Sequence, residues 1–114
     1  MSAAHFWRNL RALVAQSTVV VDRPRGSRHP RHPSLRYPLD YGHLEGTTGG
    51  DGSGVDVWLG SLPDRGVTGI ICTVDLGRRD AELKVLLGCT PEEAQQGLAV
   101  HSAGEQAGLL LEAD

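Results

Sequence analysis

Apolar and polar positions alternate along the chain in patterns that predict one helix followed by several short strands. Apolar side chains recur at helical spacing from Phe6 to Val14, with Ser2 before them as an N-cap, so a helix is expected over 3–15. The next run, from Ser17 to Val21, is rich in β-branched residues and predicts a buried strand. Prolines and glycine then interrupt regular structure until Tyr37, which favours a loop or an irregular hairpin.

Three further strands are predicted in the second half of the chain. In residues 55–59, Asp56 lies on the opposite face from its apolar neighbours, so it can face a pocket while they face the core. Trp58 shares the side of Asp56, where it either walls that pocket or packs in the core. The β-prone run 67–74 and the apolar run 83–87 complete the set, and each follows a turn.

The end of the chain is predicted to hold a second helix and one further element. Thr90 is its N-cap, Pro91 takes the first helical position, and the helix ends near Gly97. The segment from Glu105 to Leu111 is either helix or strand. Five or so strands with short turns and a late helix favour a mainly β (α+β) fold, a small five-stranded barrel with an N-terminal helix.

Composition narrows the class of protein. At 114 residues, with 39% hydrophobic and 22% charged residues, the chain is expected to form one globular domain: an N-terminal helix (1–16), a barrel core (17–89) and a C-terminal helix and tail (90–114). No apolar run approaches the roughly 20 residues that cross a bilayer. The two cysteines, Cys72 and Cys89, lack metal-ligand spacing and are expected to be buried free thiols, which favours a cytoplasmic protein.

Charge is unevenly distributed. The net charge of −3 argues against nucleic-acid binding by the chain as a whole, yet five arginines and two histidines lie between Arg23 and Arg36 with no acidic residue among them. This basic strip either attracts a phosphorylated substrate or is a solvated loop. Nucleic-acid binding through the strip is disfavoured because aromatic residues, which stack on bases, make up only 4% of the chain.

Acidic residues in the middle of the chain fall at strand ends and in tight turns. Asp51 lies on a Gly-Gly-Asp-Gly turn, Asp56 begins the strand after it, and Asp75 ends the next strand. Glu82 and Lys84 follow one turn later. If the two strands are neighbours, the carboxylates converge, and Mg²⁺ or Mn²⁺ would balance their charge. The alternative is that the aspartates cap their turns and never meet.

Two tyrosines and two aspartates at fixed spacing stand out between Tyr37 and Asp56, in Tyr-Pro-Leu-Asp-Tyr-Gly followed by Asp-Gly-Ser-Gly-Val-Asp. This stretch resembles the signature of the family I soluble inorganic pyrophosphatases, Tyr-Pro-x-x-Tyr-Gly, a short spacer, and Asp-Gly-Asp-Pro-x-Asp. Tyr41 matches the second tyrosine and Asp51 the first aspartate, whereas Ser53 replaces the middle aspartate. The strand from 69 to 75 and the Glu-Leu-Lys sequence at 82–84 resemble further parts of the pattern.

The resemblance implies an OB-like barrel and Mg²⁺-dependent hydrolysis of pyrophosphate, in which Asp56 acts as general base. It also implies four acidic metal ligands: Asp51, Asp56, Asp75 and Glu82. The residues that it implies for contact with phosphate are Arg31, Arg36, Tyr41 and Lys84. Two departures are clear, since Pro33 replaces an expected glutamate and the late Tyr-Lys pair has no counterpart.

The sequence therefore leaves two main functions open. The first is a Mg²⁺-dependent inorganic diphosphatase acting on pyrophosphate or a related phosphoanhydride, which is expected to self-associate into homo-oligomers. The second is a pyrophosphatase-like module that binds a metal or phosphate without turnover, in a regulatory role. Ser53 and Pro33 favour the second, whereas Asp56, Tyr41 and Lys84 favour the first.

Overall fold

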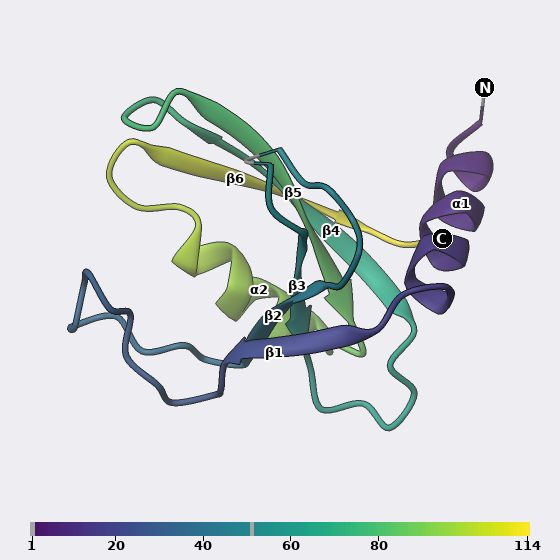
Figure 1. The fold of residues 1–114 in the computed structure, drawn as a ribbon, viewed down its shortest axis with the longest axis horizontal. Coiled ribbons are helices and arrows are strands. Elements are labelled where there is room, and N and C mark those ends of the chain that lie inside the picture. The colour runs from purple at the N-terminus through teal and green to yellow at the C-terminus, as the bar shows by residue number, and fades with distance from the viewer. Residues whose placement is uncertain (1, 51) are drawn as a thin grey trace.

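A six-stranded mixed sheet lies between two helices in the computed structural model of this chain, which describes residues 2–50 and 52–114 (Figure 1). The strands lie side by side in the order β1-β2-β3-β5-β4-β6. All pairs are antiparallel except β3 and β5, which run parallel. The elements in chain order are α1 (Ala3–Ala15), β1 (Val19–Arg23), β2 (Asp40–Leu44), β3 (Val55–Leu59), β4 (Val67–Asp75), β5 (Asp80–Leu87), α2 (Pro91–Val100) and β6 (Gln106–Glu112).

Both predicted helices are confirmed, together with their caps. The side chain of Ser2 accepts a hydrogen bond from the His5 amide at the start of α1. Thr90 and Glu93 form a capping box at the start of α2, in which each side chain accepts from the other residue's backbone amide. Helix α2 continues to Val100, beyond the glycine at 97 where the sequence suggested its end.

The closed five-stranded barrel is wrong, although the α+β class is confirmed. Strand β2 was not anticipated, because its residues lie in the stretch interpreted as a signature loop. The last segment is a strand, β6, and it pairs with β4. Strand β5 lies between β3 and β4, and β6 pairs with the outer side of β4. Strands β1 and β6 are therefore the two opposite edges of the sheet, and they are not paired with each other. The residues expected as a C-terminal tail thus belong to the sheet.

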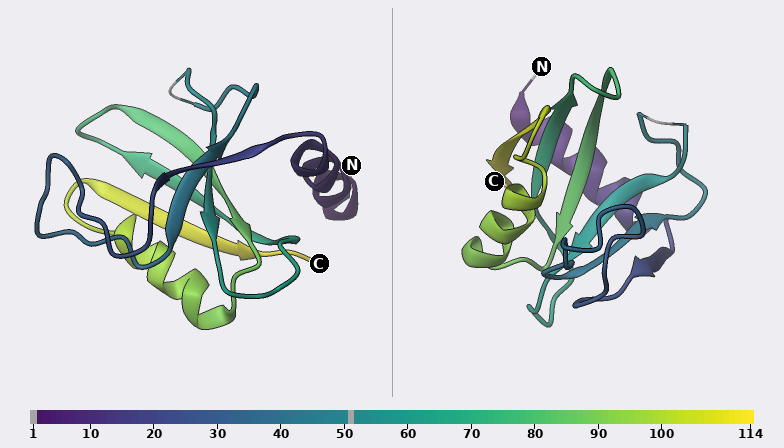
Figure 2. Two further views of the ribbon diagram at one scale, coloured as in Figure 1. Left: turned by 60° about the horizontal axis from the view of Figure 1, so that its bottom comes forward. Right: turned by 90° about the vertical axis from the view of Figure 1, so that its left-hand side faces the viewer.

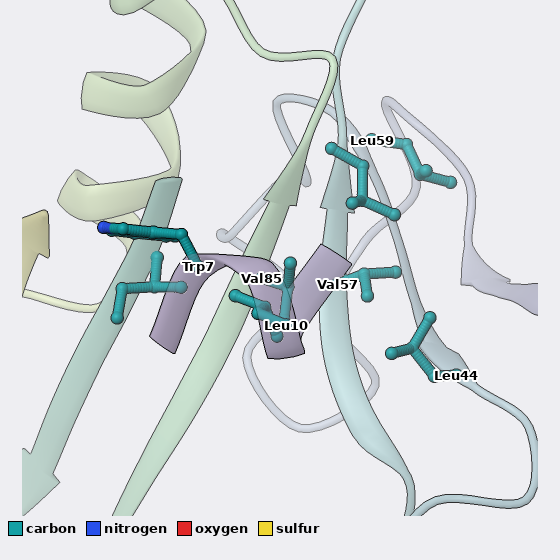
Figure 3. Close-up of a cluster of buried hydrophobic side chains, with 8 residues drawn as sticks. Trp7, Leu10, Leu44, Val57, Leu59 and Val85 are labelled. Atoms are coloured by element: carbon teal, nitrogen blue, oxygen red, sulfur yellow. The ribbon is translucent and has the colours of Figure 1, made fainter. Parts of the chain in front are cut away.

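Each helix covers one face of the sheet (Figure 2). Trp7 and Leu10 of α1 lie over side chains from β2, β3, β4 and β5 (Figure 3). On the opposite face Ala94 of α2 packs with Trp58, and Leu39 belongs to the same cluster. Alternation along β3 explains this division, since Val57 and Leu59 face α1 whereas Trp58 faces α2.

The segment between β1 and β2 forms an irregular hairpin, as expected. Arg28 and Arg36 form an isolated antiparallel bridge, and the amide of Gly26 donates to the carbonyl of Tyr37. The hairpin lies on the same side of the molecule as α2 (Figure 1). This placement brings its residues to the α2 face of the sheet, where they border a cavity.

Two further expectations bear on the class of protein. Cys72 and Cys89 are free thiols, the first half-buried and the second buried. In the part of the chain that the structure describes, no helix combines the length and apolar character needed to span a membrane.

Candidate functional site

A cavity of about 640 Å³ opens on the α2 side of the sheet. Its floor consists of residues of β2, β3 and β5, and its rim includes the turn between β4 and β5. The β1–β2 hairpin forms one wall, and the end of α2 with the turn that follows forms the other. Concave pockets of this size, with a few convergent polar groups, are the usual place for a ligand.

Strand register brings the polar floor residues together. Asp56 of β3 is the direct Cα partner of Lys84 of β5, and Tyr41 of β2 is the partner of Trp58. Side chains two residues apart on a strand share a face, so Glu82 lies on the same side as Lys84. Three neighbouring strands therefore contribute these five side chains to one surface.

Lys84 is the centre of a buried ionic network. Its Nζ donates to Oδ2 of Asp56 at 2.7 Å and also to Oε2 of Glu82. The hydroxyl of Tyr41 donates to the same Oδ2 of Asp56 at 2.8 Å. The side chains of Lys84 and Glu82 are only 5% and 8% exposed, whereas Asp56 is 23% exposed. The network thus lies at the bottom of the cavity with its open side at Asp56.

The network fixes the protonation of its donors. Burial by itself lowers the pKa of Lys84, but the adjacent carboxylates of Asp56 and Glu82 outweigh it, so the pKa is raised and the ammonium persists. Burial, followed by the charge and hydrogen bond of Asp56, raises the pKa of Tyr41 far above its ordinary value. Tyr41 therefore remains a hydrogen-bond donor at neutral pH.

One carboxylate oxygen in the network is unusual. Oε1 of Glu82 is buried and has no hydrogen-bond partner among the residues that the structure describes. A buried polar atom without a partner costs free energy, so its bonding must be completed by a group outside the described residues, such as a water, an ion or a ligand. Gly50 lies next to the Glu82 side chain, since a Cβ on Gly50 would be 3.2 Å from Cγ of Glu82. The glycine-rich loop of the signature thus reaches Glu82.

An aromatic series continues the floor toward the other end of the cavity. Trp58 Nε1 donates to Nε2 of His101 at 3.1 Å. Burial lowers the pKa of His101 to about 4, with a further contribution from the charge of Lys84, so the imidazole is neutral and accepts this bond. The Tyr41 ring lies 4.5 Å from that of Trp58, and Tyr37 lies 5.6 Å from Tyr41. The sequence left open whether Trp58 walls the pocket or packs in the core. In the structure it does both.

Asp75 lines the rim but does not join the network. It is the register partner of Asp80 at the β4–β5 turn, and its Oδ1 accepts from the amides of Gly77 and Arg78 at 2.9 and 3.1 Å. Asp75 is thus a turn cap, as the alternative interpretation of the sequence held. The premise that β3 and β4 are neighbours is wrong, because β5 lies between them.

The two arginines assigned to phosphate lie elsewhere. Arg31 and Arg36 are exposed, and neither lines the cavity. The guanidinium of Arg36 donates to the carbonyl of Gly26 at 3.4 Å. Asp51, the fourth expected metal ligand, lies outside the described residues, so its contribution stays a prediction. His43 of β2 is paired with Asp22 at 2.8 Å.

Metal-ligating groups are sparse in the described part of the chain. Within residues 2–50 and 52–114, no three histidine, cysteine or carboxylate side chains are grouped closely enough to hold a metal ion. Lys84 supplies the positive charge that the sequence analysis assigned to a cation, since it contacts both Asp56 and Glu82. The network thus holds two of the four expected metal ligands, Asp56 and Glu82, on either side of one ammonium.

His101 is the main site residue that sequence reasoning missed. It follows α2 and lies 43 positions from Trp58, so no local pattern connects the two. The only signal was a single histidine at the end of an apolar helical face. Three further residues also border the cavity: Arg78 and Glu105, which lie in turns, and Asp80, which begins β5. Their convergence depends on the sheet order.

Comparison of the chain with protein families, with curated proteins and with solved structures found no match. The site must therefore be interpreted from its own geometry.

Proposed function

We propose that this protein hydrolyses inorganic pyrophosphate or a related phosphoanhydride in a Mg²⁺-dependent reaction. The observation that carries the proposal is the network at the floor of the cavity, in which Lys84 lies between Asp56 and Glu82 and the buried Oε1 of Glu82 has no partner among the described residues. A charged donor next to a carboxylate oxygen that lacks a partner suits a ligand composed of phosphate and a divalent cation.

The carboxylates fit a cation that arrives with its substrate. Mg²⁺ usually keeps several waters and is bound through one or two carboxylates together with substrate phosphates, so a cage of three acidic side chains is not required. Asp56 and Glu82 are the described residues that would hold it, and Asp51 is the additional ligand that the sequence predicts. When bound, Mg²⁺ would neutralise phosphate charge and lower the pKa of a coordinated water.

The protein's own side chains have separate tasks in this proposal. An ammonium group has three N–H donors, and Lys84 uses two of them on Asp56 and Glu82, so one remains for a phosphate oxygen. The positive charge of Lys84 would stabilise the negative charge that develops on the departing phosphate. Tyr41 holds Asp56 in place through its hydroxyl.

Asp56 is the proposed general base. Its Oδ2 already accepts hydrogen bonds from Lys84 and Tyr41, which fixes the orientation of the carboxylate. A carboxylate has two oxygens, so Oδ1 would accept the proton of the attacking water while Oδ2 keeps its partners. Asp56 is also the most exposed of the three ionic side chains, as a group that meets water requires.

The test is phosphate release from pyrophosphate, with and without Mg²⁺, in the wild type and in the variants Asp56→Asn and Glu82→Gln. Asp56→Asn should abolish release, and Glu82→Gln should raise the Mg²⁺ concentration needed for half-maximal rate. Glu45→Gln, a change of the same kind at an exposed position outside the cavity, should leave the rate unchanged. Mg²⁺-dependent release that persists in Asp56→Asn would contradict the assignment.

A second candidate, a binding module without turnover, is favoured by one observation. Lys84 already pairs with both Asp56 and Glu82, so one of their two negative charges is balanced without a cation. Ser53 in place of an aspartate favours the same candidate. Calorimetry with pyrophosphate and Mg²⁺ distinguishes the two, because a binding module would take up the ligand without releasing phosphate. Cytoplasmic localisation and self-association stay predictions from the sequence.

A further inference from the structure

The cavity is much larger than pyrophosphate requires. Cavities of roughly 300–1,000 Å³ enclose ligands of drug size, and this one has a volume of about 640 Å³. The ionic network occupies only its end near β5 and the β4–β5 turn. The remaining space extends between the β1–β2 hairpin and the end of α2, where the lining changes from charged to aromatic and apolar.

The hairpin wall of this second region is a set of planar rings. The imidazole of His29 and the ring of Tyr37 are nearly parallel, with an interplanar angle of 11° and a centroid separation of 6.2 Å. His32 lies 5.0 Å from His29 and extends the surface outward. Burial, followed by the nearby positive charge of His32 and Arg23, lowers the pKa of His29. The imidazole of His29 is therefore neutral at pH 7 and offers a ring face rather than a charge.

The opposite wall is built from small apolar side chains. Ala99 and Val100 end α2, and Ala103 lies in the turn after it; all three border the cavity. The rings of the hairpin line the same cavity. Small apolar side chains and planar rings that line the same cavity suit a planar ligand group, because base–aromatic stacking tolerates any ring with a π face.

We propose that the substrate is a phosphoanhydride joined to a planar heterocycle, a nucleoside diphosphate, with its base between the His29 wall and Ala103. This inference rests on the proposed function, because it places the anhydride at Lys84 and Glu82. In the reaction, water adds to the terminal phosphorus and the bond from that phosphorus to the bridging oxygen breaks. A nucleoside monophosphate, inorganic phosphate and one proton leave.

The test compares three ligands by calorimetry in Mg²⁺: ADP, methyl diphosphate and pyrophosphate. Methyl diphosphate has the same anhydride as ADP but no ring. ADP should bind at least about fivefold more tightly than methyl diphosphate, the lower end of the effect of stacking one base. Phosphate release from ADP is measured in parallel.

Variants of the hairpin wall separate the ring from the hydrogen bonds of His29. Its Nδ1 accepts from the amides of Arg31 and His32 at 3.0 and 3.2 Å, so a simple truncation would also disturb the hairpin. His29→Asn keeps an acceptor and removes the ring, and should remove most of the preference for ADP. His29→Phe keeps a ring and should retain that preference. His5→Asn on α1, outside the cavity, is the matched control and should bind all three ligands as the wild type does.

Ala103→Phe approaches the same question from the opposite wall. Ala103 is exposed, so the substitution is compatible with folding, and it fills the region assigned to the base. Binding of ADP should weaken at least about fivefold. Binding of methyl diphosphate and pyrophosphate should be unchanged.

The outcomes distinguish this inference from the proposed function. If pyrophosphate is hydrolysed, but ADP binds no more tightly than methyl diphosphate, the nucleotide assignment is overturned and the hydrolase stands. If ADP binds with the expected response to His29→Asn and Ala103→Phe, but no phosphate is released, the ring site stands and the hydrolase fails. If none of the three ligands binds in Mg²⁺, both are overturned.

Discussion

Asp56 and Lys84 are direct partners in the parallel β3–β5 pair, and Nζ of Lys84 lies 2.7 Å from Oδ2 of Asp56. The contact joins two strands that are separated in sequence by the whole of β4. Because Glu82 accepts from the same ammonium, one lysine is hydrogen-bonded to two carboxylates. The polar floor of the cavity therefore depends on β5 lying between β3 and β4.

The first prediction concerns this lysine. Lys84→Met should lower the free energy of unfolding by about 3–5 kcal/mol, because removing one partner leaves buried carboxylates without compensation. Urea denaturation at pH 7 measures the loss. Adding Glu82→Gln to Lys84→Met should recover part of the stability, since it removes one of the two uncompensated charges. Equal stability of the single and double variants would show that the pair is not coupled.

The second prediction concerns pH. His101 is 7% exposed, and burial lowers its pKa from 6.5 to about 4. The unfolded state binds a proton below pH 6.5, whereas the folded state does not until about pH 4, so this contribution to stability is complete above pH 6.5 and is lost as the pH falls toward 4. The shift corresponds to about 3 kcal/mol.

A matched variant isolates this effect from the titration of carboxylates. His101→Gln keeps an acceptor for Trp58 Nε1 but does not titrate. The difference in unfolding free energy between wild type and variant, measured by urea denaturation from pH 7 to pH 4, should change steadily across that range. A difference in unfolding free energy that stays constant with pH would show that His101 has the same protonation in the folded and unfolded states.

The third prediction compares two glycines in close contact with neighbours. Gly42→Ala should destabilise the fold by at least about 2 kcal/mol, because its Cβ would lie 1.9 Å from the carbonyl oxygen of Val20 and would force β1 and β2 apart. Gly97→Ala is the control, since its Cβ would be 3.4 Å from Ile71 and helix α2 would gain up to about 1 kcal/mol in propensity. Thermal denaturation of both measures the difference, and similar melting temperatures would contradict the β1–β2 register.

The fourth prediction tests the signature. Ser53→Asp restores the aspartate that the pyrophosphatase pattern has at this position and adds an oxygen ligand and a negative charge. Mg²⁺ should bind more tightly by calorimetry, and pyrophosphate hydrolysis should increase if the site is catalytic. Unchanged Mg²⁺ affinity would mean that the loop of residues 46–54 does not contribute to a metal site, which favours the binding module.

Local chemistry was sufficient to predict both helices and most strands of this protein, but not β2, and it left β6 open as helix or strand. The caps at Ser2 and Thr90, the helical spacing of α1, and the β-prone runs of β3, β4 and β5 all act over a few residues, so they could be recognised in the sequence. Alternation along β3 also placed Asp56 and Trp58 on the same side of the strand. These predictions depend only on the periods of helices and strands.

Tertiary structure alone decided how those elements combine. Strand order is set by which apolar faces can be covered together, and nothing within β3, β4 or β5 specifies that β5 lies between the other two. That order brings Lys84 to Asp56, leaves Asp75 at the end of β4 as the cap of a turn, and keeps β1 and β6 apart as open edges. The pairing of Trp58 with His101 depends on the same arrangement, because α2 must cross the sheet before the histidine reaches the indole. Contacts between residues far apart in sequence follow from packing of the whole domain, and local patterns carry no information about them.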